Sequence, residues 1–108
     1  MLVLGCDILP AFGGEIAAML IESVEIFSDQ TNAAVMRHPG RAFPGVLVQG
    51  DSLYSLCCRA DVVCKAMGRD SPGYEEANDL RNALWSYMNH YKAILVAHEM
   101  KLPFSENT

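Results

Sequence analysis

The chain has 108 residues, of which 51% are hydrophobic and 19% are charged. This length can bury the core of one modest domain, and the composition excludes an intrinsically disordered chain. The formal net charge is −5. Nucleic acids and anionic membranes bind clustered Lys and Arg, so we expect neither as the main partner. No apolar run approaches the roughly 18 residues that would span a bilayer.

The cysteine pattern favours a reducing compartment. The four cysteines are Cys6, Cys57, Cys58 and Cys64, and no two of them have C-x-x-C spacing. A disulfide framework or a zinc site is therefore not expected, and we predict reduced, mostly buried thiols. This reading places the protein in the cytoplasm. We expect no metal and no cofactor.

The sequence divides into three parts. Residues 1–18 form an apolar N-terminal extension that is interrupted by Gly and Pro, and residues 105–108 form a polar tail. Between them, residues 19–104 are expected to form a single α+β domain.

The first half of this domain predicts β-structure. Residues 21–27 alternate in part between polar and apolar side chains, which is typical of a half-buried strand. Residues 33–38 and 46–49 predict a second and a third strand, and the segments between the three are rich in turn-forming residues. Because the connections are short, we predict an antiparallel meander.

A helix is predicted directly after the third strand. Asp51 or Ser52 is expected to cap its N-terminus. Gly68 is expected to end it in a left-handed conformation. One apolar stripe recurs at three- and four-residue spacing, and it consists of Leu53, Leu56, Cys57, Ala60, Val63, Cys64 and Met67.

A second and longer helix should follow, of about 26 residues or roughly 39 Å. Ser71 is the predicted N-cap, and Pro72 suits the first helical position. The main apolar stripe has Trp85, Met88 and Leu95 to one side, and it consists of Ala77, Leu80, Leu84, Tyr87, Tyr91 and Ile94. The fold class is therefore α+β, with a three-stranded antiparallel meander followed by two helices packed on one face. Because the last helix has apolar width to spare, we predict a homodimer formed through it.

Residues 50–53 spell Gly-Asp-Ser-Leu, the name motif of the GDSL esterases. In that family the serine follows the first strand and acts as the nucleophile, and a later Asp-x-x-His block is also needed. None of His38, His90 and His98 has an Asp three residues before it. A nucleophilic serine needs a general base. We therefore interpret the match as coincidental, and as a strand-to-helix junction built from Gly50, Ser52 and Leu53.

Two family resemblances arise around the third strand. The segments Arg41–Val46 and Gln49–Leu53 carry the pattern R-x-F-P-G-V-x-x-Q-G-D-S-L, and the segment Asn32–Val35 (Asn-Ala-Ala-Val) precedes them. With these segments, residues 20–104 resemble a small bacterial protein family of unknown function. The segments 43–45 and 49–53 are also similar to HicB-type antitoxins, in which a meander ends in Pro-Gly, a strand, Gln-Gly-Asp-Thr/Ser and a helix. HicB proteins usually carry acidic residues early in that helix, whereas this chain has Tyr54-Ser55-Leu56.

The polar residues around the turns are the candidate binding residues. Pro44 and Gly45 should hold the preceding loop in a defined shape. The candidate binding residues form either an internal hydrogen-bond network or a recognition surface. They are Asn32, Arg37, His38, Arg41, Phe43, Gln49 and Asp51.

From these features we expect a non-enzymatic binding protein that acts by protein–protein interaction. Small size, acidity and the HicB-like segment favour an immunity- or antitoxin-like protein with a cognate protein partner. The alternative is a small-ligand or nucleotide-binding regulator that uses Arg37, Arg41 and Gln49. An esterase that depends on Ser52 is the remote third hypothesis.

Overall fold

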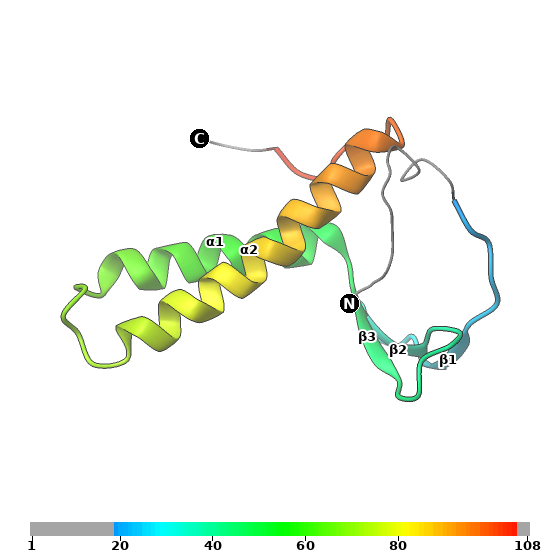
Figure 1. The fold of residues 1–108 in the computed structure, drawn as a ribbon, viewed down its shortest axis with the longest axis horizontal. Coiled ribbons are helices and arrows are strands. Elements are labelled where there is room, and N and C mark those ends of the chain that lie inside the picture. Colours follow the sequence, from blue (N-terminus) through cyan, green and yellow to red (C-terminus); the bar gives the residue numbers. More distant parts are fainter. Residues whose placement is uncertain (1–18, 106–108) are drawn as a thin grey trace.

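The computed structural model describes residues 19–105, so the predicted N-terminal extension and most of the polar tail lie outside the described residues. Its elements in chain order are the strands β1 (Glu25–Ser28), β2 (Ala33–Arg37) and β3 (Gly45–Val48) and the helices α1 (Gly50–Ala66) and α2 (Tyr74–Ala97). The predicted α+β class is therefore confirmed, with a three-stranded sheet followed by two helices (Figure 1).

The sheet is the predicted antiparallel meander, with strand order β1-β2-β3. Val35 of β2 pairs with Val46 of β3, and Glu25 of β1 pairs with Arg37 of β2. The ladder between β1 and β2 shifts register between residues 26 and 28. Strand β1 begins at Glu25 rather than Ile21, since β2 ends at the partner of Glu25 and leaves the preceding residues no strand to pair with.

The two helices pack against each other as a hairpin. Among residues 19–105, the buried hydrophobic side chains are Cys57, Cys64 and Met88, and all three lie in this hairpin. Cys57, Cys58 and Cys64 are free thiols. Burial raises the pKa of the Cys57 thiol, and the neighbouring Cys58 and Asp61 add to the shift. Met88, expected beside the apolar stripe, is thus one of the centres of the core.

The helices do not cover the sheet, and the prediction that they pack on one of its faces is wrong. Most packing contacts in the molecule join α1 to α2 or one strand to the next. In Figure 1 the hairpin extends away from the sheet, and the turn between α1 and α2 lies at the end of the molecule opposite to the sheet. The reason is local, because Gln49 alone separates β3 from α1 and the helix therefore continues outward from the strand instead of folding back over it.

The helix ends also differ from the predictions. Helix α1 is followed by Met67 in an extended conformation, and Gly68 does not have the left-handed conformation expected of it. Helix α2 begins at Tyr74 after Gly73, whose φ of 84° is the left-handed turn of this connection. Ser71 therefore caps no helix, and its Oγ instead accepts a hydrogen bond from the Gly68 N–H at 3.0 Å.

Candidate functional site

The loop between β2 and β3 borders an open hollow of about 460 Å³. Phe43, at the tip of the loop, is 81% exposed, and Val46 and Leu47 on the adjoining strand are 62% and 53% exposed. A phenyl ring so open to water contributes nothing to the core of this chain. The hollow is lined by Met36, His38, Arg41, Phe43, Pro44, Gly45, Val46 and Leu47.

Backbone geometry fixes the shape of this loop. Gly40 has a φ of 83°, and the Arg41 N–H donates to the His38 carbonyl at 3.1 Å, which closes a tight turn. The His38 Nδ1 lies 2.8 Å from the Pro39 carbonyl. Because a carbonyl can only accept, this contact requires the proton on Nδ1. The turn thus places Arg41 and Phe43 on the hollow.

Arg37 is held by internal contacts. Its Nε donates to Glu25 Oε1 at 2.6 Å, a second nitrogen of the same guanidinium pairs with that oxygen, and its carbon lies 5.8 Å from the centre of the Phe27 ring. These contacts join β2 to β1 across the sheet. Of the two interpretations offered for the polar residues, an internal network describes Arg37 better than a recognition surface does.

The candidate residues fall into two groups at opposite ends of the sheet. Arg37, His38, Arg41 and Phe43 lie at the loop end. Val48 pairs with Ala33, so the residues that follow β3 lie beside the residue that precedes β2. Asn32, Gln49 and Asp51 therefore lie at the other end. The five residues of β2 separate the two groups by about 17 Å, and one small ligand could not contact both.

The strand-to-helix junction has a packing role. A Cβ on Gly50 would lie 2.2 Å from the Tyr91 ring, so only glycine leaves room for α2 at this point. Gln49 is the N-cap and uses no side-chain hydrogen bond, whereas Asp51 accepts from the Ser52 N–H at 2.8 Å. The cap was predicted at Asp51 or Ser52. Asp51 does satisfy an open N–H of the first turn, but from inside the helix.

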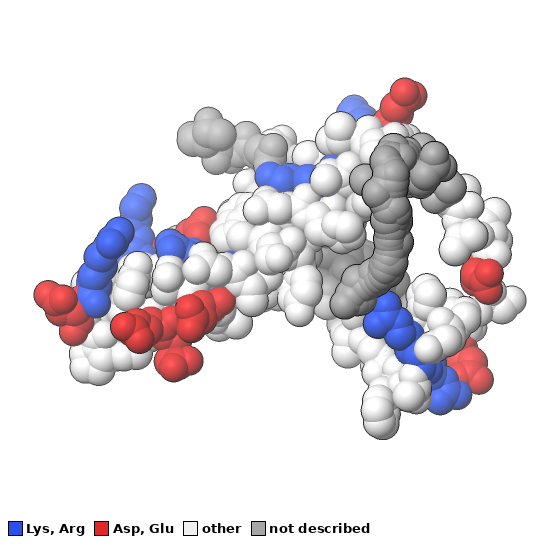
Figure 2. All heavy atoms as spheres, in the orientation of Figure 1, with Lys and Arg blue, Asp and Glu red and all other residues white. Residues whose placement is uncertain are grey.

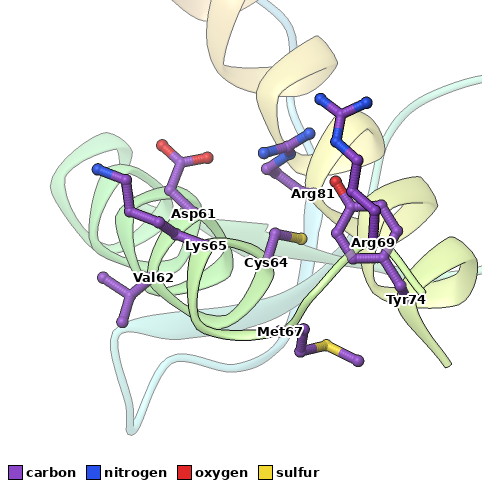
Figure 3. Close-up of a pocket in the computed structure, with 8 residues that line it drawn as sticks. All are labelled: Asp61, Val62, Cys64, Lys65, Met67, Arg69, Tyr74 and Arg81. Atoms are coloured by element: carbon purple, nitrogen blue, oxygen red, sulfur yellow. The ribbon is translucent and has the colours of Figure 1, made fainter. Parts of the chain in front are cut away.

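A second groove lies at the closed end of the hairpin, and it was not singled out in the sequence (Figure 3). Its volume is about 570 Å³, and three of the eight basic residues of the chain line it, namely Lys65, Arg69 and Arg81. Asp61 on its wall accepts a hydrogen bond from Trp85 Nε1 at 3.0 Å, and Arg81 donates to Asn78. The basic residues are spread over 17 positions of sequence, so only the hairpin itself reveals the cluster.

Charge is unevenly distributed over the visible face of the molecule (Figure 2). Acidic side chains gather around the start of α2, where Glu75 and Glu76 occupy the first turn, while the middle of the hairpin carries little charge in this view. Within residues 19–105, no three His, Cys, Asp or Glu side chains gather in a way that could hold a metal ion. Neither helix of this region has the length and apolarity that crossing a membrane requires.

Comparison with known proteins gives a family but no activity. Neither the curated proteins nor the solved structures include a match to this chain. A family model does match, over residues 19–104, which include the whole sheet and both helices. The chain therefore belongs to the DUF6959 family, a family of unknown function.

Proposed function

We propose that this chain is a non-enzymatic binding protein whose sheet and β2–β3 loop bind a partner protein. The observation that carries the proposal is the open sheet. Its strands β2 and β3 have the sequences AAVMR and GVLV, and neither contains a buried residue. Nearly continuous apolar strands are typical of sheets that are covered on both faces.

Apolar side chains lie on both faces of the sheet. Val35 and Val46 are opposite each other and share one face, and Ala34 and Leu47 share the other. A small sheet needs a hydrophobic face, or packing against a helix, to be stable. The α1–α2 hairpin supplies little of that packing, so a partner chain would supply it.

Phe43 is the expected anchor of this interface. Aromatic side chains on a shaped surface are the commonest hot spots of protein–protein contacts. The ring projects from a loop that the Arg41–His38 backbone hydrogen bond and Pro44 constrain, so little conformational entropy is lost when it is buried. Arg41 beside it adds a charge-assisted donor for a carboxylate or carbonyl of the partner.

An immunity- or antitoxin-like role is the specific form of this proposal. It is supported by the small size, the net charge of −5 and the Gln-Gly-Asp-Ser junction that follows the third strand. The junction also supports a role without catalysis, because Gly50 makes room for Tyr91 and Asp51 binds a backbone N–H. Gly50 and Asp51 thus each have a structural task that explains their presence.

The test is capture of a partner by the full chain in its native host, with covalent cross-linking. We expect one protein to be captured by the wild type and to cross-link to residues 36–47. The double substitution Phe43→Ser with Val46→Lys should weaken its binding by about 100-fold, because both changes lie at the proposed anchor. Val62→Lys is the matched control, since Val62 is an exposed apolar residue of the hairpin, away from the sheet.

The antitoxin-like form makes a further demand. The captured protein, produced alone, should arrest growth, and co-production of this chain should restore it, whereas the Phe43/Val46 variant should not. If no captured protein depends on Phe43 and Val46, the proposal is wrong.

A small-ligand function is the second candidate, and the hollow at the loop favours it. His38 and Arg41 line this hollow beside apolar side chains, which is the mixture that small-molecule sites use. Native mass spectrometry after gentle purification separates the two candidates. A retained molecule that disappears in an Arg41→Ala variant would favour the ligand-binding function, and a bare chain would favour the protein partner.

A further inference from the structure

The two long sides of the helical hairpin differ in chemistry. One side is closed by polar and aromatic contacts, in which Asp61 accepts from Trp85 and Tyr54 meets the Trp85 ring edge-on at 6.1 Å. The other side carries four large hydrophobic residues that stay exposed, and we call it the apolar face. They are Leu56 (47% exposed), Val63 (51%), Leu80 (60%) and Tyr87 (67%).

Helix geometry places these four residues on one side. Leu56 and Val63 each precede a buried cysteine by one residue, and Tyr87 precedes the buried Met88 by one. One step back along a helix turns the side chain by 100°. The two helices run in opposite directions, and each faces the core from the opposite side. Because both of these directions are reversed, one step back along either helix leads to the same side of the pair. Leu80, eight residues before Met88, lies within 20° of Tyr87 by the same count.

The apolar face also lies opposite the basic groove of the hairpin tip. The groove is lined by Asp61, Lys65 and Arg81, among others. Counted at 100° per residue, all three lie on the side of the core where Trp85 lies. On the α2 part of the apolar face, the nearest acidic residue by helical spacing is Glu76, one turn before Leu80. On the α1 part, the exposed Arg59 follows Leu56 by three residues and precedes Val63 by four. By the same count Arg59 lies at the outer edge of the face, on the side away from α2, so its charge is not between the two helices.

We propose that the apolar face binds a second copy of this chain, so that two hairpins form a four-helix bundle. The spacing supports this occupant. Leu56 and Val63 are seven residues apart, and so are Leu80 and Tyr87. A seven-residue hydrophobic repeat is the pattern by which bundle helices interlock. Because both helices carry the same repeat, the face is complementary to itself under a twofold rotation.

The size of the face also fits a dimer. The 17 residues of α1 span about 25 Å, and two helices side by side are about 20 Å wide. Two such faces in contact would bury on the order of 1,000 Å², the lower bound for a specific interface. The dimer would also enlarge a core that, within residues 19–105, has three buried hydrophobic side chains.

Analytical ultracentrifugation of the purified full chain tests this proposal. The wild type should sediment at twice the 11.9 kDa of one chain at micromolar concentration. Val63→Lys should weaken the dimer by about 100-fold or more, because a twofold axis buries the new charge in both copies. Val62→Lys is the control, since this neighbouring valine is 66% exposed but lies 100° around the helix, and its dimer should be unchanged.

Circular dichroism separates loss of association from loss of folding. Should Val63→Lys unfold, Tyr87→Lys provides the same test on the other helix, at a position too exposed to matter for the folded monomer. A wild-type chain that sediments as a monomer at about 100 μM would overturn the proposal and leave the face to another occupant. Equal effects of Val62→Lys and Val63→Lys would also overturn it, and so would a dimer that Val46→Lys alone dissociates. Because the experiment uses the isolated chain, its outcome is independent of the proposed partner.

Discussion

The helical hairpin and the sheet both contain many apolar residues, and they use them in opposite ways. In the hairpin, Cys57, Cys64 and Met88 are buried between two helices that neighbour each other in the chain. In the sheet, the apolar side chains of β2 and β3 meet no second layer formed by residues 19–105. The hairpin therefore contains the buried core of the part of the chain that the structure describes, whereas the sheet depends on backbone pairing and on whatever covers it. Within residues 19–105, burial is thus concentrated in the hairpin, and the strands β2 and β3 stay open.

The largest expected change in the free energy of unfolding comes from comparing one substitution in the hairpin with one in the sheet. Met88→Ala should lower the free energy of unfolding by about 2–5 kcal/mol, because it opens a cavity where the side chain is fully buried. Leu47→Ala should cost less than about 1 kcal/mol in the isolated chain, since Leu47 is already half in water. Urea unfolding followed by circular dichroism measures both. Equal losses would show that the sheet is covered as well as the hairpin is.

The junction between the two regions comes next. Gly50→Ala should destabilise by about 1–3 kcal/mol, because the added methyl overlaps the Tyr91 ring. In a Tyr91→Ala background the same change should cost nothing or stabilise, since alanine favours the helix by up to about 1 kcal/mol. A double-mutant cycle in urea measures the coupling. Additive effects would contradict the close approach of Gly50 and Tyr91.

The polar side of the hairpin should contribute a smaller amount. Trp85→Phe removes the indole N–H that Asp61 accepts, and we expect a loss of about 1 kcal/mol. The edge-on contact with Tyr54 stays possible for a phenyl ring. Asp61→Asn is the control, because the amide oxygen can still accept from Trp85. Thermal unfolding should rank the wild type first, Asp61→Asn second and Trp85→Phe last.

The smallest effect is expected in the sheet. Arg37→Ala breaks the ion pair with Glu25, whose side chain is 61% exposed. Solvent screening limits such a pair to between about 0 and 1 kcal/mol. The loss should shrink further as sodium chloride is raised toward about 1 M. A loss of several kcal/mol that ignores salt would mean that Arg37 has a role beyond this pair.

Local patterns predicted the elements of the fold well. Alternation and turn residues located all three strands, and three- and four-residue spacing located both helices. The packing of the helices against the sheet was predicted wrongly. That arrangement depends on the direction in which α1 leaves β3, and hydrophobic periodicity carries no information about direction. Met88 was misplaced for the same reason, because the stripe of one helix does not reveal which of its edges faces the neighbour.

The sequence predicted the loop of the candidate site, but it did not predict which of the candidate residues lie together. Pro and Gly residues marked the loop, and the structure places His38, Arg41 and Phe43 around one hollow there. Gln49 and Asp51 are close to these residues in sequence, yet the strand between them carries them to the far end of the sheet. The role of Gly50 could not be predicted either, because it depends on Tyr91, which lies 41 positions later.

The single-residue connection at Gln49 has a consequence for binding strength. Because one residue separates strand and helix, the end of each sheet stays next to the start of its own hairpin. Two hairpins joined in a bundle would hold two sheets at a set separation. Such a pair would act as a bivalent ligand, for which the second contact with a paired target takes place at a high effective concentration. A weak interface on one sheet could then give durable binding, provided that the target is itself a dimer with matching spacing.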